Sequence, residues 1–251
     1  MFRTWSFVAA IFILGCQKIE KPTASSLIDK TIQVYGWNID SVVDIDFDFR
    51  DYHYQLMRQP NQFLYRRSTV LDGMRIVDEM SNSSRLVRSQ EGALVQLSDS
   101  LTQLYSNALN SVLYFFQIPR PLKDAAVISE LIGEASILGE SYWKIKITFE
   151  QNGGGEDFQD EYRYWIHKET YHIDYLAYNY ATSGGGTRFR QAIDPQVING
   201  IRFQDYINFK PNTKFPDLDS LSILFEMGEL KEISRIENKN INVKKTPLTM
   251  R

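Results

Sequence analysis

The 251-residue chain contains a single cysteine, Cys16. One cysteine excludes an intrachain disulfide, and if Cys16 is itself modified, no thiol remains to act as a nucleophile or to bind a metal. The protein must then be stabilised by its own hydrophobic core. The composition allows this, because 43% of the residues are hydrophobic and 13% are aromatic. The aromatic residues include 14 tyrosines and 15 phenylalanines, which favour β-strands.

The sequence also lacks an excess of charge and the common catalytic motifs. Its 28 basic and 31 acidic residues give a formal net charge of -3. A mildly acidic chain offers no basic surface of the kind that binds nucleic acid. Neither a G-x-S-x-G nor an H-E-x-x-H motif is present. We therefore expect no cofactor and no catalytic residues.

Histidine is scarce, with only His53, His167 and His172. His167 and His172 flank a tight turn at 168–170, and Glu169 and Asp174 could complete a metal site with them. Spacing alone is weak support for a site that needs several converging ligands. Side chains next to a turn on alternating strands more often point to solvent, so we predict no metal site.

The N-terminal apolar run, Phe7–Leu14, is far too short to span a bilayer, which takes ~20 residues. Arg3 precedes the run and Gly15 follows it. A cation, a short apolar core and a small residue at the cleavage point are typical of a secretory signal peptide. We predict a signal peptide over residues 1–15.

Residues 13–16, Ile-Leu-Gly-Cys, resemble the bacterial lipobox. The resemblance implies diacylation of the Cys16 sulfur, cleavage before Cys16 and acylation of the new N-terminus, with palmitate as a representative acyl group. Two or three acyl chains give stable anchoring. Residues 16–24 would then be a lipidated tether to a membrane of the bacterial envelope, in our interpretation the outer membrane. The alternative is a buried N-terminal helix that happens to contain a cysteine.

The hydrophobic periodicity indicates two helices. The first follows a cap at Ser25 or Ser26 and ends at Gly36, which suits a helix C-terminus. The second runs from Ser100 to about Phe116 and carries a broad apolar stripe. Such a helix could be a plug that fills the core or a lid over a ligand cavity, and both interpretations remain open.

The rest of the chain has the pattern of antiparallel strands. From Ser41 the hydrophobic period is two, and Asp72-Gly73 and Asn199-Gly200 are strong hairpin signals. We count roughly 11–12 strands and find no β-α-β alternation of the kind that builds a parallel sheet. The polar tail, residues 241–251, is expected to fray.

Several stretches carry a resemblance to a known fold family. They read Tyr164-Trp165-Ile166-His167-Lys168-Glu169-Thr170 with Tyr175-Leu176, Arg188-Phe189-Arg190, and Asn199-Gly200-Ile201-Arg202-Phe203-Gln204-Asp205-Tyr206. With the order of elements, they make residues 25–240 similar to a single-domain family of lipoproteins from Bacteroidota-type bacteria with a LolA/LolB-like fold. The resemblance implies a mainly β (α+β) protein, an unclosed antiparallel half-barrel whose concave apolar face is covered by helices.

The half-barrel implies that the tethered protein, as a monomer, binds lipid or lipoprotein acyl chains in its concave face. The candidate lining residues are those expected to face inward: Phe47, Phe49, Leu104, Leu113, Phe116, Tyr162 and Tyr164. One alternative is a structural or interaction lipoprotein with a filled core. The least favoured is a hydrolase of envelope glycans or lipids, which would need an inward-facing carboxylate or histidine cluster.

Overall fold

The computed structural model describes residues 21–38, 41–60, 62–82, 84–151, 160–181 and 184–247. The predicted signal peptide, the lipidation site Cys16 and the tether up to residue 20 lie outside the described residues. The expected tail lies outside them from residue 248 onward.

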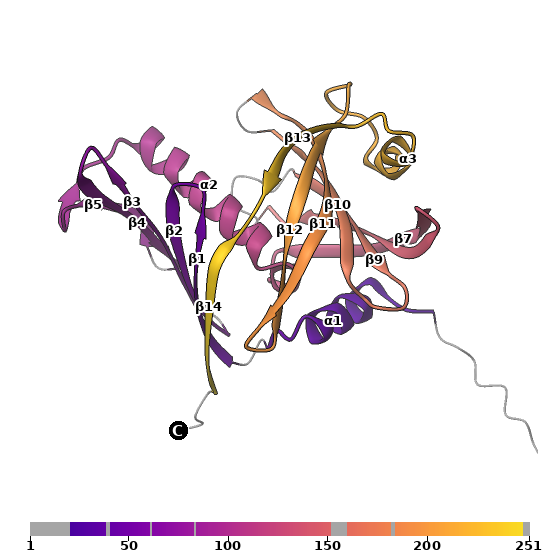
Figure 1. Ribbon diagram of the computed structural model, residues 1–251, viewed down its shortest axis with the longest axis horizontal. Coiled ribbons are helices and arrows are strands. Elements are labelled where there is room, and N and C mark those ends of the chain that lie inside the picture. The colour runs from indigo at the N-terminus through magenta and orange to yellow at the C-terminus, as the bar shows by residue number, and fades with distance from the viewer. Residues whose placement is uncertain are drawn as a thin grey trace, which may run out of the picture.

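The described residues form fourteen strands in two antiparallel sheets of seven (Figure 1). In spatial order, sheet A contains β14 (Lys239–Pro247), β1 (Ser41–Phe49), β2 (Tyr52–Gln59), β3 (Gln62–Leu71), β4 (Met74–Ser81), β5 (Ser84–Gln90) and β6 (Ala93–Val95). Sheet B contains β13 (Lys231–Ile236), β12 (Ile201–Lys210), β11 (Gly186–Ile198), β10 (Ile173–Tyr180), β9 (Glu161–His167), β8 (Glu140–Phe149) and β7 (Val127–Ile137).

The two sheets do not close into a barrel. At one border of each sheet, β13 leads directly into β14, so the chain steps from sheet B to sheet A. At the opposite borders, β6 and β7 are joined through the helix α2 (Asp99–Phe116), which lies in the hollow between the sheets (Figure 1). The predicted unclosed, mainly β fold is confirmed.

The strand pattern follows the predicted period of two. In β1 the side chains of Val43, Ile45 and Phe47 are buried, while the intervening aspartates are half-buried. The inner side chains belong to the main core, which fills part of the space between the sheets. Burial of one face is what fixes the register of such a strand, because a slip by one residue would turn the aspartates inward.

We had expected residues 241–247 to be frayed. They instead belong to β14, which pairs with β1. Val243 is buried in the main core, and Asn242 Nδ2 donates to Asp46 Oδ2 at 3.1 Å. The sequence of β14 is polar because it is an edge strand with few inward positions. β14 is one of the strands that raise the observed number to fourteen, above the predicted 11–12.

Each of the two predicted helices begins with a capping side chain, although the first is capped by Thr23 and not by Ser25 or Ser26. Helix α1 (Ala24–Val34) is capped by Thr23, whose side chain accepts a hydrogen bond from the Ser26 backbone while Ser26 bonds back. Ser98 caps α2 by accepting from Leu101 N at 3.3 Å. Among the residues that the structure describes, none of the helices has both the length and the hydropathy needed to cross a membrane.

Two further short elements, η1 (Arg120–Lys123) and η3 (Leu218–Ser220), precede β7 and α3 (Leu221–Glu226) respectively. The helix α3, which we did not predict, covers the outer face of sheet B. Phe225 packs there against Tyr175 and Phe189, in a second core cluster around Trp165. The central strands β9 and β10 are therefore buried on both faces.

Candidate functional site

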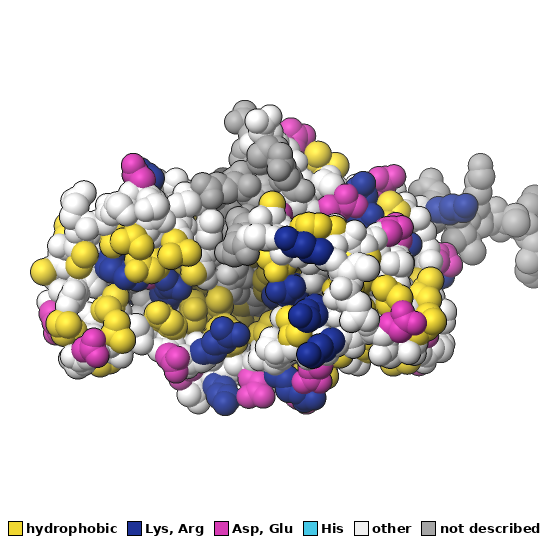
Figure 2. Space-filling view, turned by 90° about the horizontal axis from the view of Figure 1, so that it is seen from above, with side chains coloured by type: hydrophobic (Ala, Val, Ile, Leu, Met, Phe, Trp, Pro, Cys, Tyr) yellow, Lys and Arg dark blue, Asp and Glu magenta, His cyan; other side chains and the backbone are white. Residues whose placement is uncertain are grey.

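A groove of about 1510 Å³ lies in the hollow between the sheets, beside α2. Figure 2 shows hydrophobic side chains in a hollow near the middle of the upper face, with Lys and Arg side chains next to them. The groove is larger than the ~300–1,000 Å³ of a typical small-molecule pocket. Its aromatic lining residues are Phe49, Phe63, Tyr65, Tyr114, Phe115, Phe116, Phe149, Tyr162, Tyr178, Tyr180 and Tyr206.

Helix α2 borders the groove because only part of its surface is used for packing. Leu109, Leu113 and Phe116 are buried, and the helix packs against β3, β4 and β5 of sheet A. Asn110 and Ser111, which lie between these positions, line the groove instead. The predicted plug or lid thus packs mainly on sheet A, contacts sheet B through Tyr114, Phe115 and Phe116 at its C-terminal end, and leaves space beside it.

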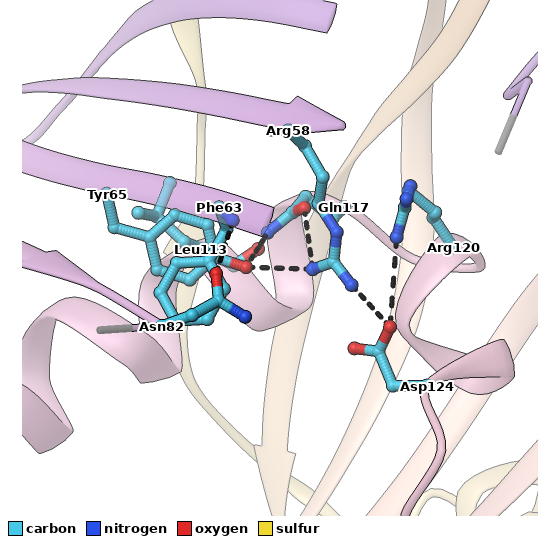
Figure 3. Close-up of polar contacts among 8 residues, drawn as sticks. All are labelled: Arg58, Phe63, Tyr65, Asn82, Leu113, Gln117, Arg120 and Asp124. Carbon is cyan, nitrogen blue, oxygen red and sulfur yellow. Dashed lines mark hydrogen bonds and ion pairs between the residues drawn. The ribbon is translucent and has the colours of Figure 1, made fainter. Parts of the chain in front are cut away.

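A buried polar network attaches the C-terminal end of α2 to sheet A (Figure 3). Arg58 Nη1 donates to the Tyr65 hydroxyl at 2.9 Å and to Gln117 Oε1 at 3.3 Å, while Arg58 Nη2 pairs with Asp124. Gln117 Nε2 donates to the same hydroxyl at 2.9 Å. Arg120 lies 3.7 Å from Asp124, and burial together with Arg58 lowers the pKa of Arg120 to about 10. The carboxylate of Asp124 therefore pairs with two buried guanidinium groups, those of Arg58 and Arg120.

A second network attaches the N-terminal half of α2. Asp78 is 1% exposed and accepts from Arg67 Nε at 2.9 Å and from Arg88 Nε at 2.7 Å. The Arg88 guanidinium lies 3.6 Å from the ring centroid of Tyr105 on α2. Its hydrogen bonds to Asp78 hold the pKa of Arg88 above its usual range. The helix is thus held to sheet A near both ends, which fixes its position beside the groove.

The side of the groove formed by sheet B is aromatic. The rings of Tyr162 and Tyr178 stack at 5.3 Å, and Phe115 of α2 lies 5.0 Å from Tyr178. The hydroxyls of Tyr114 and Tyr164 are 3.4 Å apart. Burial raises the pKa of both phenols, so these hydroxyls stay neutral. This side of the groove therefore offers apolar ring faces, with the Tyr114 hydroxyl held by the buried Tyr164 behind it.

Three of the seven predicted lining residues, Phe49, Phe116 and Tyr162, line the groove. Leu104 is 56% exposed on the surface of α2 and is not among the lining residues. The apolar stripe on α2 is wider than the surface that sheet A covers, so its N-terminal part remains in solvent.

The other three predicted residues, Phe47, Leu113 and Tyr164, are fully buried and do not line the groove. The Phe47 ring stacks on Phe116 at 3.7 Å, so Phe116 separates it from the groove. Leu113 is buried where α2 packs against the core. Alternation predicts correctly that these side chains face inward but does not distinguish a core position from a wall.

Cationic side chains also line the groove, and sequence reasoning missed them. Five lining residues are Lys or Arg and three are Asp or Glu, although the whole chain has a net charge of -3. Arg188 and Arg190 of β11 both line it, and Phe189 between them is buried on the opposite face of the sheet. Alternation around Phe189 is the signal that could have placed the two arginines on the groove side.

His167 and His172 lie close together but are not arranged as metal ligands. His167 Nδ1 accepts from two backbone N–H groups of the following turn at 3.2 Å, and Nε2 lies 3.2 Å from Glu140. Burial and the Arg202 charge lower the pKa of His172 to about 4. Within the described ranges, no three His, Cys, Asp or Glu side chains gather in a way that could hold a metal ion.

A solved structure of low sequence identity shows the same fold. A LolA superfamily protein from Nitrosomonas europaea matches with a TM-score of 0.50 and 14% identity, over 90% of this chain and 96% of that chain. A DUF1329 family protein from Desulfovibrio piger gives 0.48 and 11%, over 87% and 92% of the two chains. An outer membrane lipoprotein-sorting protein domain from Vibrio parahaemolyticus gives 0.40 and 5%, over 89% and 92%. The match to the LolA superfamily protein confirms the expected LolA-like fold.

No curated protein matches the sequence. A family model described as "Family of unknown function (DUF6503)" matches residues 3–238, which is nearly the whole chain. Neither this description nor that of the LolA superfamily protein names a catalytic activity. The chain, an unclosed LolA-like fold with an aromatic groove, belongs to the DUF6503 family.

Proposed function

We propose that this protein is an envelope lipoprotein that binds lipid or lipoprotein acyl chains in the groove beside α2. The observation that supports this function is the groove itself, about 1510 Å³ in volume with eleven aromatic residues among its lining. A filled core would leave no such space. An acyl chain needs apolar walls, and each Å² of apolar surface removed from water contributes roughly 25 cal/mol to binding.

The lipid on Cys16 would keep this groove near a membrane. The described chain starts at residue 21, inside the predicted tether, and α1 begins at Ala24. The seven or eight residues from Cys16 to the start of α1 would span at most about 29 Å if fully extended. A monomer held this close to the outer membrane could exchange acyl chains with it. The LolA superfamily neighbour supports this proposal by its fold alone, because the identity is low.

The first experiment is native mass spectrometry of residues 17–251, released gently from cells. A bound mass in the lipid range is expected, together with saturable binding of a fluorescent fatty acid by the delipidated protein. Absence of both would contradict the proposal.

A pair of tryptophan substitutions on α2 locates the binding site. Ser111 lines the groove, whereas Leu104 does not. We expect Ser111→Trp to fill part of the groove and weaken fatty-acid binding at least about tenfold, while Leu104→Trp has no effect. Equal binding by both variants would place the ligand elsewhere.

A second candidate function is docking of another envelope component. Val70, Leu71 and Leu94 are 69%, 57% and 78% exposed near the ends of two hairpins of sheet A. These hairpins adjoin, since Glu91 N donates to Arg75 O at 2.9 Å. If the groove binds no fatty acid, we expect a stoichiometric partner that is lost in Leu71→Glu/Leu94→Glu.

A further inference from the structure

One arginine on the groove differs from all other buried arginines of the described chain. Five arginines are buried there, and four of them pair with a carboxylate. The pairs are Arg58 and Arg120 with Asp124, Arg67 with Asp78, and Arg163 with Glu161 and Asp219. The fifth, Arg190, is 8% exposed and has no carboxylate partner among the described residues. A buried guanidinium without an anion is costly, because it is removed from water without compensation.

The surroundings of Arg190 hold it in place but do not satisfy it. Its guanidinium carbon lies 3.8 Å from the ring centroid of Phe115, and Nη2 donates to the Tyr178 hydroxyl at 2.8 Å. Stacking on an aromatic ring leaves the in-plane N–H groups free to donate. The Nε–H group is buried and has no partner. Arg190, Phe115 and Tyr178 all line the groove.

A second unsatisfied polar group lies directly across the strand pair. Asn208 of β12 is the register partner of Arg190 on β11, and it too is 8% exposed and lines the groove. Its Nδ2 donates to Ser234 Oγ at 3.3 Å, and its Oδ1 has no partner. Rotation of the amide would present Nδ2 to the groove and leave the oxygen to accept from the Ser234 hydroxyl. The site can therefore offer donors from two adjacent strands.

We propose that the groove binds an amphiphile with a carboxylate head group, which pairs with Arg190 and is completed by the amide of Asn208. The apolar chain then lies along the aromatic side of the groove. This proposal rests on the proposed function and names its ligand class. A charge-assisted pair between guanidinium and carboxylate is among the strongest polar contacts. One guanidinium neutralises one carboxylate, whereas a phosphate monoester carries about -1.5 to -2 and would also need a second cation, such as Arg188 on the same strand.

The test compares ligands that share a chain and differ in the head group. Binding of laurate, dodecanol and dodecyl phosphate is measured by displacement of a fluorescent probe from the delipidated protein. The variants are Arg190→Met, which keeps the apolar stem, and Arg190→Lys, which keeps the charge. Arg202→Met is the matched control, because Arg202 also has a buried Nε without a partner but lies outside the groove, 5.5 Å from the Tyr35 ring.

We expect wild-type protein to bind laurate about tenfold or more tighter than dodecanol, in line with one charge-assisted pair. Arg190→Met should bring this ratio close to one through loss of laurate affinity alone, and Arg190→Lys should retain part of it. Arg202→Met should retain all of it. Unchanged dodecanol binding shows that the Arg190→Met variant is folded with an intact groove.

Other outcomes overturn the proposal in distinguishable ways. Equal affinity for laurate and dodecanol in the wild type, or a ratio that survives Arg190→Met, refutes the carboxylate site while groove binding stands. Tighter binding of dodecyl phosphate than of laurate refutes the carboxylate as the head group. If neither laurate nor dodecanol binds, the proposed function itself fails.

Discussion

At the scale of single residues, two glycines explain how α1 is attached to the sheets. Gly36 follows α1 with a φ of +74°, and a Cβ on it would lie 1.8 Å from the carbonyl oxygen of Gly200. Arg202 N donates to Tyr35 O at 2.8 Å, and Lys245 Nζ donates to Gly36 O at 3.2 Å. The end of the helix thus meets the β11–β12 turn and β14 at one point, where there is no room for a side chain.

We expect Gly36→Ala to lower the free energy of unfolding more than a positive φ alone can explain. The left-handed conformation costs a non-glycine residue roughly 1–2 kcal/mol, and the clash with Gly200 should add about 1–3 kcal/mol as overpacking. Gly73→Ala is the matched control, since Gly73 has a φ of +76° and no atom near the position of a Cβ. Urea unfolding measures the free energy of unfolding of both variants. An equal loss of stability in the two would contradict the close approach of Gly36 to Gly200.

At the scale of elements, α2 decides whether the hollow between the sheets is a core or a groove. Its hydrophobic stripe predicts a helix that packs on something apolar, which is correct. The stripe does not reveal which sheet receives it. That choice depends on polar contacts between distant parts of the chain, such as Gln117 with Arg58 and Tyr105 with Arg88. Such pairs have no sequence periodicity, so local patterns could not predict the groove.

We expect Gln117→Leu to destabilise the protein by about 1–3 kcal/mol, because Arg58 and the Tyr65 hydroxyl would lose a buried partner. Gln103→Leu on the same helix removes only a bond from Gln103 Nε2 to Asn107 Oδ1 at 2.8 Å, within the helix. Such a pair is worth about 0.2–0.5 kcal/mol. Thermal melts compare the two variants, and a similar small loss in both would show that the network does not anchor α2.

The sequence predicts the strands and hairpins well and the site only in part. Alternation placed Phe47 and Tyr164 inward, and the Asn199-Gly200 signal marked a true hairpin. Alternation did not predict β14, because the sequence of an edge strand with one buried valine resembles that of a polar tail. Alternation also did not single out Arg190, because a charged residue on a strand normally faces solvent. Arg190 is a buried groove residue because Phe115 of α2 packs against it.

At the scale of the whole molecule, β14 joins the first and last parts of the fold. It is the border strand of sheet A, although it follows directly from sheet B. Asn199 Nδ2, in the β11–β12 turn, donates to Val243 O at 3.2 Å, and Asn238 N donates to Asp205 Oδ1 at 2.9 Å. These contacts fasten the border at which the two sheets meet.

We expect removal of residues 239–251 to lower the free energy of unfolding by at least about 2 kcal/mol, the value of burying one valine. It should also cause self-association, because β1 would become an unpaired edge with alternating apolar residues. Removal of residues 248–251 alone, which follow β14, serves as the control and should change neither property. Urea unfolding and size-exclusion chromatography give the two readouts. A stable monomer ending at residue 238 would contradict this role of β14.

The border between the sheets has a mechanical consequence. In the described chain, no strand of one sheet pairs with a strand of the other, so the angle between them can change without breaking the ladder of either. Opening about the β13–β14 link would leave the hydrogen bonds within each sheet intact and would have to separate the side chains packed between the sheets. A bound chain would act as a wedge, and its thickness rather than its length would set the opening. We therefore expect the affinity for a ligand to depend little on the length of its acyl chain and strongly on chain branching or on the number of chains.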